Sequence, residues 1–214
     1  ADGSEAQMCG NASRCVGKYV YDNGLTDKTE ISLETKAGIK KLSLAISGGK
    51  VSSVCVDMGE PVLDPCRIPV ALSAKDAVAV PIELCGTTYT MTCVSMGNPH
   101  AVIFVPSLDA IDVHALGPVA ECHPLFPERC NIEFAEVLSP ERIAMRVWER
   151  GAGETLACGT GACATLVAAV LNRLTRRKAR LELLGGNLDI EWGDDHHVYM
   201  TGGAVTVFKG EWLL

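Results

Sequence analysis

Residues 153–160 read GETLACGT, and residues 3–11 read GSEAQMCGN. Both stretches contain a glutamate, three intervening residues, a cysteine, a glycine and a small polar residue. Helix-like runs follow them, at residues 12–21 and 161–174. A cysteine in the first turn of a helix lies beside unpaired backbone N–H groups and the positive end of the helix dipole, which favour its thiolate. The repeat predicts a symmetric pair, Cys9 and Cys158, facing each other across one ligand. An enzyme that inverts a carbon centre with two bases needs such a pair.

The overall composition is that of a soluble globular protein. The 214 residues are 48% hydrophobic and 21% charged, with a net charge of −7 and a pI near 5.2. An acidic chain lacks the basic face that nucleic-acid binding requires, so we expect no nucleic-acid partner. No apolar run reaches the roughly 20 residues that cross a bilayer, so we expect no membrane partner. One basic cluster falls where the second helix is expected to end, which favours a solvated helix cap; it consists of Arg173, Arg176, Arg177, Lys178 and Arg180.

The ten cysteines are scattered through the chain, and no C-x-x-C motif occurs. Zinc sites of the ribbon or finger type are therefore not expected, and we predict no metal. Cys55, Cys85 and Cys93 lie in apolar or strand-like runs and are predicted to be small buried core residues. This cysteine usage favours a reducing, cytoplasmic setting.

Alternating apolar and polar residues predict many strands, with few helices between them. Besides the two helices above, a short helical piece is expected at residues 108–116. Gly48-Gly49 predicts a tight hairpin turn. Many strands with one helix in each half indicate an α+β fold in which strands wrap around a central helix. The predicted strands are 30–35, 41–47, 51–58, 77–84, 88–95, 101–105, 132–138, 142–148, 180–184, 188–192, 198–201 and 205–208.

Two domains are expected, with a boundary near Gly49. The first would comprise residues 1–49 and 204–214, because the closing strand could return to the first half. The second would comprise residues 50–203. A shorter echo joins residues 56–61 to residues 94–99, and only the second copy is followed by polar side chains suited to holding a ligand, Asn98 and His100.

Several polar residues around the two cysteines could bind a substrate. Gly10 and Gly159 let the backbone approach a ligand closely, and the N–H groups behind them could bind a carboxylate. Asn11 and Thr160 could do the same or act only as helix caps.

A second group lies in the loop before the second cysteine and in another strand. Arg150, beside a Gly-rich loop, could hold a substrate carboxylate, or form a surface pair with Glu149. Asn131 begins a strand and, taken alone, would be read as a turn residue.

These motifs together resemble the diaminopimelate epimerase family. The resemblance covers the whole chain in order, through residues 1–11, 96–100, 131–133 and 149–161. It implies two pseudo-symmetric domains, with the active site in the cleft between them. Related proline racemases usually carry histidine where this chain has Asn11, and phenazine-biosynthesis relatives lack the cysteine pair.

By this resemblance, Cys9 and Cys158 would be the two acid/base residues of an isomerase that interconverts LL- and meso-2,6-diaminopimelate. One thiolate would remove the α-proton and the opposite thiol would protonate the other face, with no cofactor. Gly10, Asn11, Gly159 and Thr160 would bind the carboxylate at the reacting carbon. His100 and Glu149 would lie near the thiols and help to set their protonation. Asn98, Asn131, Glu149 and Arg150 would hold the distal end of diaminopimelate.

The resemblance also carries expectations about the rest of the protein. The family uses an N-terminal Gly-Asn-Asp-Phe segment that these residues do not contain, so we expect sequence upstream of Ala1. A homodimer remains open. Three alternatives are a proline racemase-like enzyme of the same fold, a thiol redox switch and a non-catalytic amino-acid-binding module. The absence of C-x-x-C counts against the redox switch.

Overall fold

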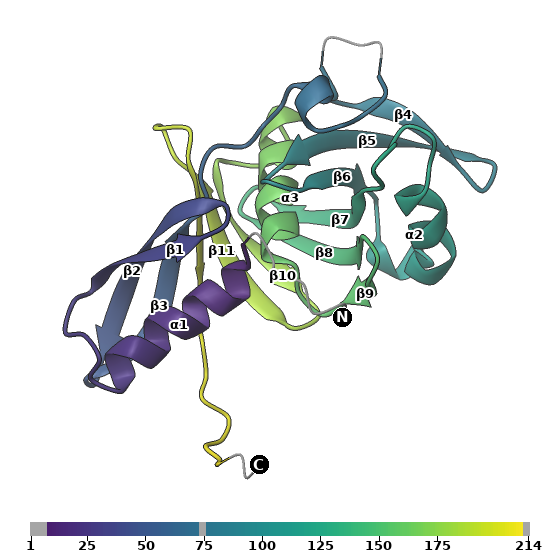
Figure 1. Ribbon diagram of the computed structural model, residues 1–214. Helices are drawn as coiled ribbons and strands as arrows, with labels where there is room; N and C mark the ends of the chain where they lie inside the picture. Colours follow the sequence, from purple (N-terminus) through teal and green to yellow (C-terminus); the bar gives the residue numbers. More distant parts are fainter. Residues whose placement is uncertain (1–7, 73–75, 212–214) are drawn as a thin grey trace. The chain divides into compact units, whose positions relative to one another are not determined.

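The computed structural model describes residues 8–72 and 76–211, and these divide into two compact units (Figure 1). Unit 1 contains residues 1–56 and 201–214, and unit 2 contains residues 57–200. The sequence placed the boundary near Gly49, at the turn of a hairpin. The observed division instead follows the second strand of that hairpin, because its hydrogen bonds to the first strand keep the two together.

Unit 1 is a helix on a three-stranded antiparallel meander. Helix α1 (Gly10–Asp22) is followed by β1 (Glu30–Thr35), β2 (Gly38–Ser47) and β3 (Lys50–Asp57). The helix packs through Gly17, whose missing side chain lets Leu42, Leu44 and Val54 of the sheet come close. The predicted turn at Gly48-Gly49 is confirmed, since both glycines have positive φ, as a tight hairpin requires.

Unit 2 is a mixed sheet whose strand order is β12-β11-β10-β8-β7-β6-β5-β4, with β9 paired to β8. The pairs β6–β7 and β8–β10 are parallel, whereas β4–β5, β5–β6, β7–β8, β8–β9 and β10–β11 are antiparallel. The strands are β4 (Val80–Leu84), β5 (Thr87–Ser95), β6 (Pro99–Phe104), β7 (Asn131–Ser139), β8 (Arg142–Glu149), β9 (Gly153–Thr155), β10 (Lys178–Leu183), β11 (Gly186–Trp192) and β12 (Val198–Gly202).

Two helices cover opposite faces of this sheet, as the alternation along β6 and β7 shows. Ala101, Ile103, Ile132 and Phe134 belong to the apolar core that includes α2 (Val113–Glu121). The residues between them face the other way, toward α3 (Gly159–Leu171), so Glu133 lies beside the first turn of α3. The central strands are therefore buried on both sides, which explains their nearly continuous apolar sequence. Short 3-10 helices complete the unit, η1 (Pro65–Arg67) and η2 (Leu108–Ala110).

The α+β class and most strands are confirmed, with four differences. The expected helix at residues 108–116 is the 3-10 turn η2 followed by α2, which contains Pro118 and packs through Gly117 on the Trp148 ring. Strand β9 was not expected. Residues 205–208 form no strand, although their segment belongs to unit 1 as predicted. Cys85 is exposed rather than buried, because it occupies the β4–β5 turn with positive φ.

The basic cluster does not cap a helix. Helix α3 ends at Leu171, and its last turn contains no basic residue. Arg177 instead donates to the carbonyls of Trp192 and Gly193 and stacks on the Trp192 ring. Lys178 and Arg180 pair with carboxylates of β11. The cluster thus ties strands together. Among the described residues, no helix is both long and apolar enough to cross a membrane.

Candidate functional site

Cys158 is the N-cap residue of α3, at the position that the sequence predicted for it. Its backbone is extended, and its sulfur accepts a hydrogen bond from the Gly161 amide at 3.4 Å. The side chain is only 6% exposed. The first amides of a helix have no acceptor within the helix, so those of Gly159 and Thr160 are oriented to bind an anion beside this sulfur.

The environment of Cys158 favours the thiol over the thiolate. Burial raises the pKa of Cys158 to about 12, and the nearby carboxylates of Glu149 and Glu133 act in the same direction. Hydrogen bonds from the Thr160 hydroxyl and the Gly161 amide lower this pKa. The helix start thus favours the thiolate as expected, but burial and two negative charges outweigh it. Cys158 is a protonated thiol at neutral pH.

A chain of polar side chains leads from Cys158 into the sheet. The Thr160 hydroxyl lies 3.4 Å from the Cys158 sulfur and accepts from the Asn98 amide at 3.3 Å. The Asn98 carbonyl oxygen lies 3.1 Å from His100 Nε2. His100 Nδ1 lies 2.7 Å from Glu133 Oε1. Asn98 and His100, selected from the sequence, therefore lie on one hydrogen-bonded path to Cys158.

Glu133 is the functional candidate that the sequence analysis missed. Its side chain is completely buried, and its second oxygen, Oε2, has no hydrogen-bond partner. A Cβ placed at Gly161 would lie 2.6 Å from Oε1, so the carboxylate lies against the first turn of α3. The available signal was its position two residues after Asn131, as the first carboxylate in an apolar strand.

The expected distal-binding residues are distributed differently in the structure. Both polar ends of Asn131 are used internally, because its amide donates to the Pro99 carbonyl and its oxygen accepts from the Arg150 backbone N–H. Asn131 thereby fixes the backbone of Arg150. The Arg150 side chain is exposed and donates to the Glu128 carbonyl at 3.1 Å. Glu149 accepts from the Thr155 hydroxyl. Glu149 and Arg150 therefore have separate partners and do not form the surface pair that was the alternative interpretation.

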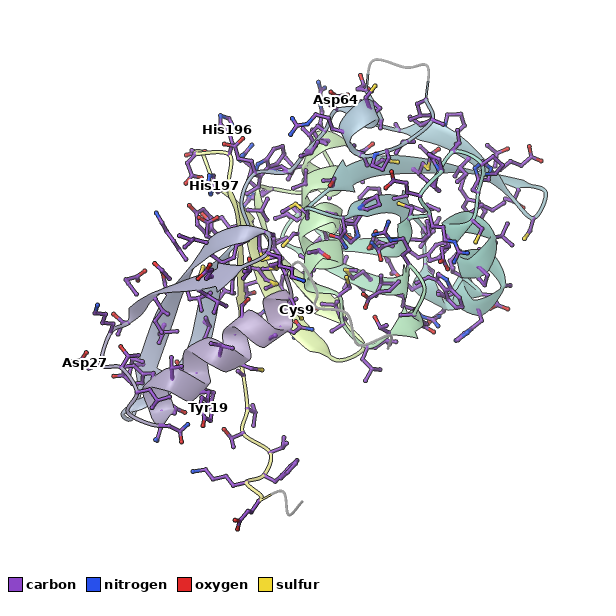
Figure 2. All side chains as sticks on the ribbon, in the orientation of Figure 1. Cys9, Tyr19, Asp27, Asp64, His196 and His197 are labelled. Carbon is purple, nitrogen blue, oxygen red and sulfur yellow. The ribbon has the colours of Figure 1, made fainter. Side chains whose placement is uncertain are left out.

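Cys9 is the N-cap residue of α1 in unit 1 (Figure 2). It is exposed, and its side chain makes no capping hydrogen bond. Asn11 accepts from the guanidinium of Arg14 at 3.0 Å, and Arg14 also donates to the Gly203 carbonyl. Arg14, which the sequence analysis did not select, thus holds the Asn11 side chain. Residues 1–7 of the first motif lie outside the described residues.

Within the described ranges, no group of three or more histidine, cysteine or acidic side chains is arranged to hold a metal ion.

Known proteins match the chain over almost its whole length. The family model described as "Diaminopimelate epimerase" matches residues 1–63 and 92–207. A diaminopimelate epimerase of Desulfovibrio desulfuricans is 57% identical over 100% of this chain and 77% of its own length. One from Acetivibrio thermocellus is 58% identical over 99% of this chain and 76% of its own length. A diaminopimelate epimerase from Methanococcus maripaludis is 54% identical over 99% of this chain and 76% of its own length.

Two solved structures share the fold at much lower identity. A phenazine biosynthesis protein from Enterococcus faecalis has a TM-score of 0.69 at 14% identity, covering 98% of this chain and 74% of its own. A probable proline racemase from Agrobacterium radiobacter has a TM-score of 0.66 at 15% identity, covering 94% and 68%. These likenesses establish the fold alone. The family match and the relatives above 50% identity show that the chain belongs to the diaminopimelate epimerase family.

Proposed function

We propose that this protein interconverts LL- and meso-2,6-diaminopimelate by proton transfer at the α-carbon, in lysine and peptidoglycan precursor biosynthesis. The observation that carries the proposal is the Cys158 thiol, buried at the start of α3 and held in its protonated form. A general acid must carry its proton at working pH, and Cys158 does so. The names of the close relatives support the same substrate.

In the direction that uses Cys158 as the acid, Cys9 acts as the base. The Cys9 thiolate takes the α-proton, and the C–H electron pair remains on the substrate as a carbanion. The Cys158 S–H then gives its proton to the opposite face of that carbon. Cys9 ends as a thiol and Cys158 as a thiolate, so the proton count balances and the centre is inverted. The reverse reaction exchanges the two roles, and no cofactor takes part.

The helix starts supply the electrostatic part of the mechanism. As the α-proton leaves, negative charge spreads into the substrate carboxylate. The first amides of a helix have no acceptor within the helix, so those of Gly159 and Thr160 in α3, and those of Gly10 and Asn11 in α1, would donate to this charge. Of the four side chains expected to bind the distal end, Arg150 and Glu149 retain hydrogen-bonding capacity for a ligand, whereas Asn98 and Asn131 make internal hydrogen bonds that keep the site in shape.

Solvent exchange tests the proposal directly. The protein is incubated in D₂O with diaminopimelate and no added pyridoxal phosphate, and the α-carbons are followed by mass spectrometry and NMR. We expect deuterium at an α-carbon together with conversion between the LL and meso forms. Exchange on proline with none on diaminopimelate would reject this function and favour the proline racemase-like alternative. Binding of diaminopimelate without any exchange would favour the amino-acid-binding module.

We further infer a small-molecule substrate as the main partner and a cytoplasmic setting, in which reduced thiols are maintained. A homodimer stays a prediction, which sedimentation of the purified protein checks.

A further inference from the structure

The polar chain behind Cys158 has a direction, because each of its hydrogen bonds has a donor and an acceptor. It joins α3 to three successive segments of the sheet, and His100 and Glu133 within it are completely buried. Its members, in order from the sulfur, are Cys158, Thr160, Asn98, His100 and Glu133.

The orientation of Asn98 sets the direction near the sulfur. Its nitrogen can only donate, and it donates to the Thr160 oxygen at 3.3 Å. The Thr160 hydroxyl hydrogen is then not used toward Asn98 and can be donated to the Cys158 sulfur, 3.4 Å away. A donor aimed at sulfur stabilises the thiolate that Cys158 must become after giving up its proton.

The orientation of Asn98 in turn depends on His100. The Asn98 oxygen lies 3.1 Å from His100 Nε2 and is an acceptor, so Nε2 must carry a hydrogen. The other ring nitrogen, Nδ1, lies 2.7 Å from Glu133 Oε1, and one hydrogen must lie between these two atoms. Together, His100 and Glu133 therefore hold two hydrogens, one between Nδ1 and Oε1 and one on Nε2.

If the pair held only one hydrogen, the chain would reverse. That hydrogen would stay on Nδ1, where the carboxylate accepts it, and Nε2 would become an acceptor. The Asn98 amide would then turn its nitrogen to His100 and its oxygen to Thr160. The Thr160 hydroxyl would donate to Asn98, and Cys158 would lose the donor that stabilises its thiolate.

We propose that Glu133 is a positioning residue for Cys158: with His100 it holds the Nε2 hydrogen that fixes Asn98, and so aims the Thr160 hydroxyl at the sulfur. The role of Cys158 as acid and base, which this assignment uses, rests on the proposed function. The hydrogen-bond geometry from which the assignment is argued does not depend on that function. Glu133 takes no part in the proton transfer itself, and its positioning role is separate from the direct effect of its charge, which raises the pKa of Cys158.

Few other ionisable groups surround the pair. Cys93 on β5 and Cys130 before β7 interact electrostatically with Glu133, and burial raises the pKa of both thiols, so both are neutral at ordinary pH. Glu149 on β8 acts on Cys158 directly. Arg150 acts on Cys130.

The first experiment observes the His100 ring directly. Long-range ¹H–¹⁵N NMR spectra distinguish ring nitrogens with and without hydrogen, and the chain contains only five histidines. We expect His100 Nε2 to carry hydrogen in the wild-type protein. Glu133→Gln should keep this form, since its amide can donate to Nδ1, whereas Glu133→Met should favour the Nδ1–H form, since a thioether sulfur can accept a hydrogen bond but cannot donate one. Glu136→Gln is the matched control, because Glu136 is on the same strand but accepts from Leu108 on the other side. A bare Nε2 in the wild type would overturn the proposal.

The second experiment separates two effects of Glu133 on the thiolate fraction of Cys158: the effect through the hydrogen-bonded side chains and the direct effect of its charge. The alkylation rate of Cys158 is measured by peptide mass mapping at about pH 8.5, near the ordinary pKa of a thiol, where it follows the thiolate fraction. Thr160→Val should slow alkylation about three- to tenfold by removing the hydroxyl donor. In the Glu133→Met background the same substitution should have little effect, because the hydroxyl is no longer aimed at the sulfur.

An equal effect of Thr160→Val in both backgrounds would overturn the proposal, since independent sites add. Should Glu133→Met not fold, the wild-type and Glu133→Gln spectra still decide the outcome, because loss of the Nε2 hydrogen in either contradicts the assignment. None of these measurements uses turnover. An inactive protein that met all the expectations would reject the proposed epimerase function and leave the role of Glu133 in place.

Discussion

Helices α1 and α3 begin with the same Cys-Gly motif, yet the two cysteines differ in burial and in hydrogen bonding. Ten of the 13 residues of α3 are buried, against four of the 13 in α1. Cys158 is 6% exposed and its sulfur accepts from the Gly161 amide, whereas Cys9 is exposed and its side chain makes no capping hydrogen bond. The motif thus fixes where each helix begins, and the surroundings of Cys158 raise the pKa of its thiol.

The difference shows how a duplicated motif can supply two different acid/base groups. Two identical environments would give two thiols of equal acidity, but proton transfer needs one thiolate and one thiol at a time. Burial and two carboxylates hold Cys158 in the protonated form. The asymmetry between the helices therefore matches the division of roles in the proposed reaction.

The largest expected effect comes from removing either thiol. Cys9→Ala and Cys158→Ala should each lower the epimerisation rate about 10²- to 10⁴-fold, the usual contribution of a general acid or base. Cys15→Ala on α1 and Cys163→Ala on α3 are the matched controls and should stay near the wild-type rate. The rate is measured as interconversion of LL- and meso-diaminopimelate. If Cys9→Ala or Cys158→Ala kept an epimerisation rate within tenfold of the wild type, the proposal that these two cysteines act as a pair would be contradicted.

Substitution of Arg150 tests whether this residue, in the loop before α3, contributes to substrate specificity. Arg150→Lys should lower kcat/KM for diaminopimelate about ten- to a hundredfold, because an ammonium cannot replace a bidentate guanidinium. Arg142→Lys, at the exposed start of β8, the strand that Arg150 follows, is the control. If Arg150→Lys leaves kcat/KM unchanged, the residue is only part of the surface.

Substituting one glycine in each helix tests how tightly α1 and α3 are packed. A Cβ at Gly161 would lie 2.6 Å from Glu133 Oε1 and 3.3 Å from the Cys158 sulfur, in a buried site. Gly161→Ala should therefore lower the free energy of unfolding by about 1–3 kcal/mol. A Cβ at Gly17 on α1 would lie 3.0 Å from the end of the Leu44 side chain, which can rotate away, and 3.5 Å from Leu42 and Val54, which is ordinary contact, so the effect of Gly17→Ala should be smaller. Urea unfolding of both variants measures the difference, and equal losses would contradict it.

The smallest effect concerns the end of α1, which is held by polar contacts rather than by burial. Asp22 accepts from the Val51 amide at 2.9 Å and pairs with Lys18 at 2.7 Å, and the hydrogen bond from Lys18, followed by that from Val51, lowers its pKa. A lowered folded-state pKa gives stability above the unfolded value of about 4, which is lost as the pH falls through the folded value. Urea midpoints between neutral and acidic pH should fall less in Asp22→Asn than in the wild type. The same pH dependence in both proteins would exclude this role.

The sequence predicted those features that depend on local patterns. Period-2 alternation located most strands, and the Cys-Gly repeats located the beginnings of α1 and α3, because both patterns arise within a few residues. The end of α3 was wrong by three residues: the apolar run stops at Leu171, and Asn172 and Arg173 already form the turn. The predicted strand at residues 205–208 failed because alternation alone does not provide a partner strand.

The features that sequence reasoning could not supply are those set by distant residues. Glu133 looks like a solvent-facing carboxylate in a strand, and only the position of α3 over that strand buries it. The acidity of Cys158 depends in the same way on burial and on Glu149 and Glu133, which the order of residues around the cysteine does not reveal. Asn98 and Asn131 were selected for a ligand, which stays a prediction, and the internal hydrogen bonds that hold them come from residues distant in the sequence.

Strands β6 and β7 run parallel with α2 between them in the chain, and β8 and β10 run parallel with α3 between them. Such crossovers are almost always right-handed. Both step across the sheet in the same direction, but β7 and β8 are antiparallel, so the second crossover starts from a strand of opposite direction. Two connections of one hand, with strands reversed, must put their helices on opposite faces. The chirality of the polypeptide therefore already assigns Cys158 and its carboxylate Glu133 to one face of the sheet, and the apolar packing of α2 to the other.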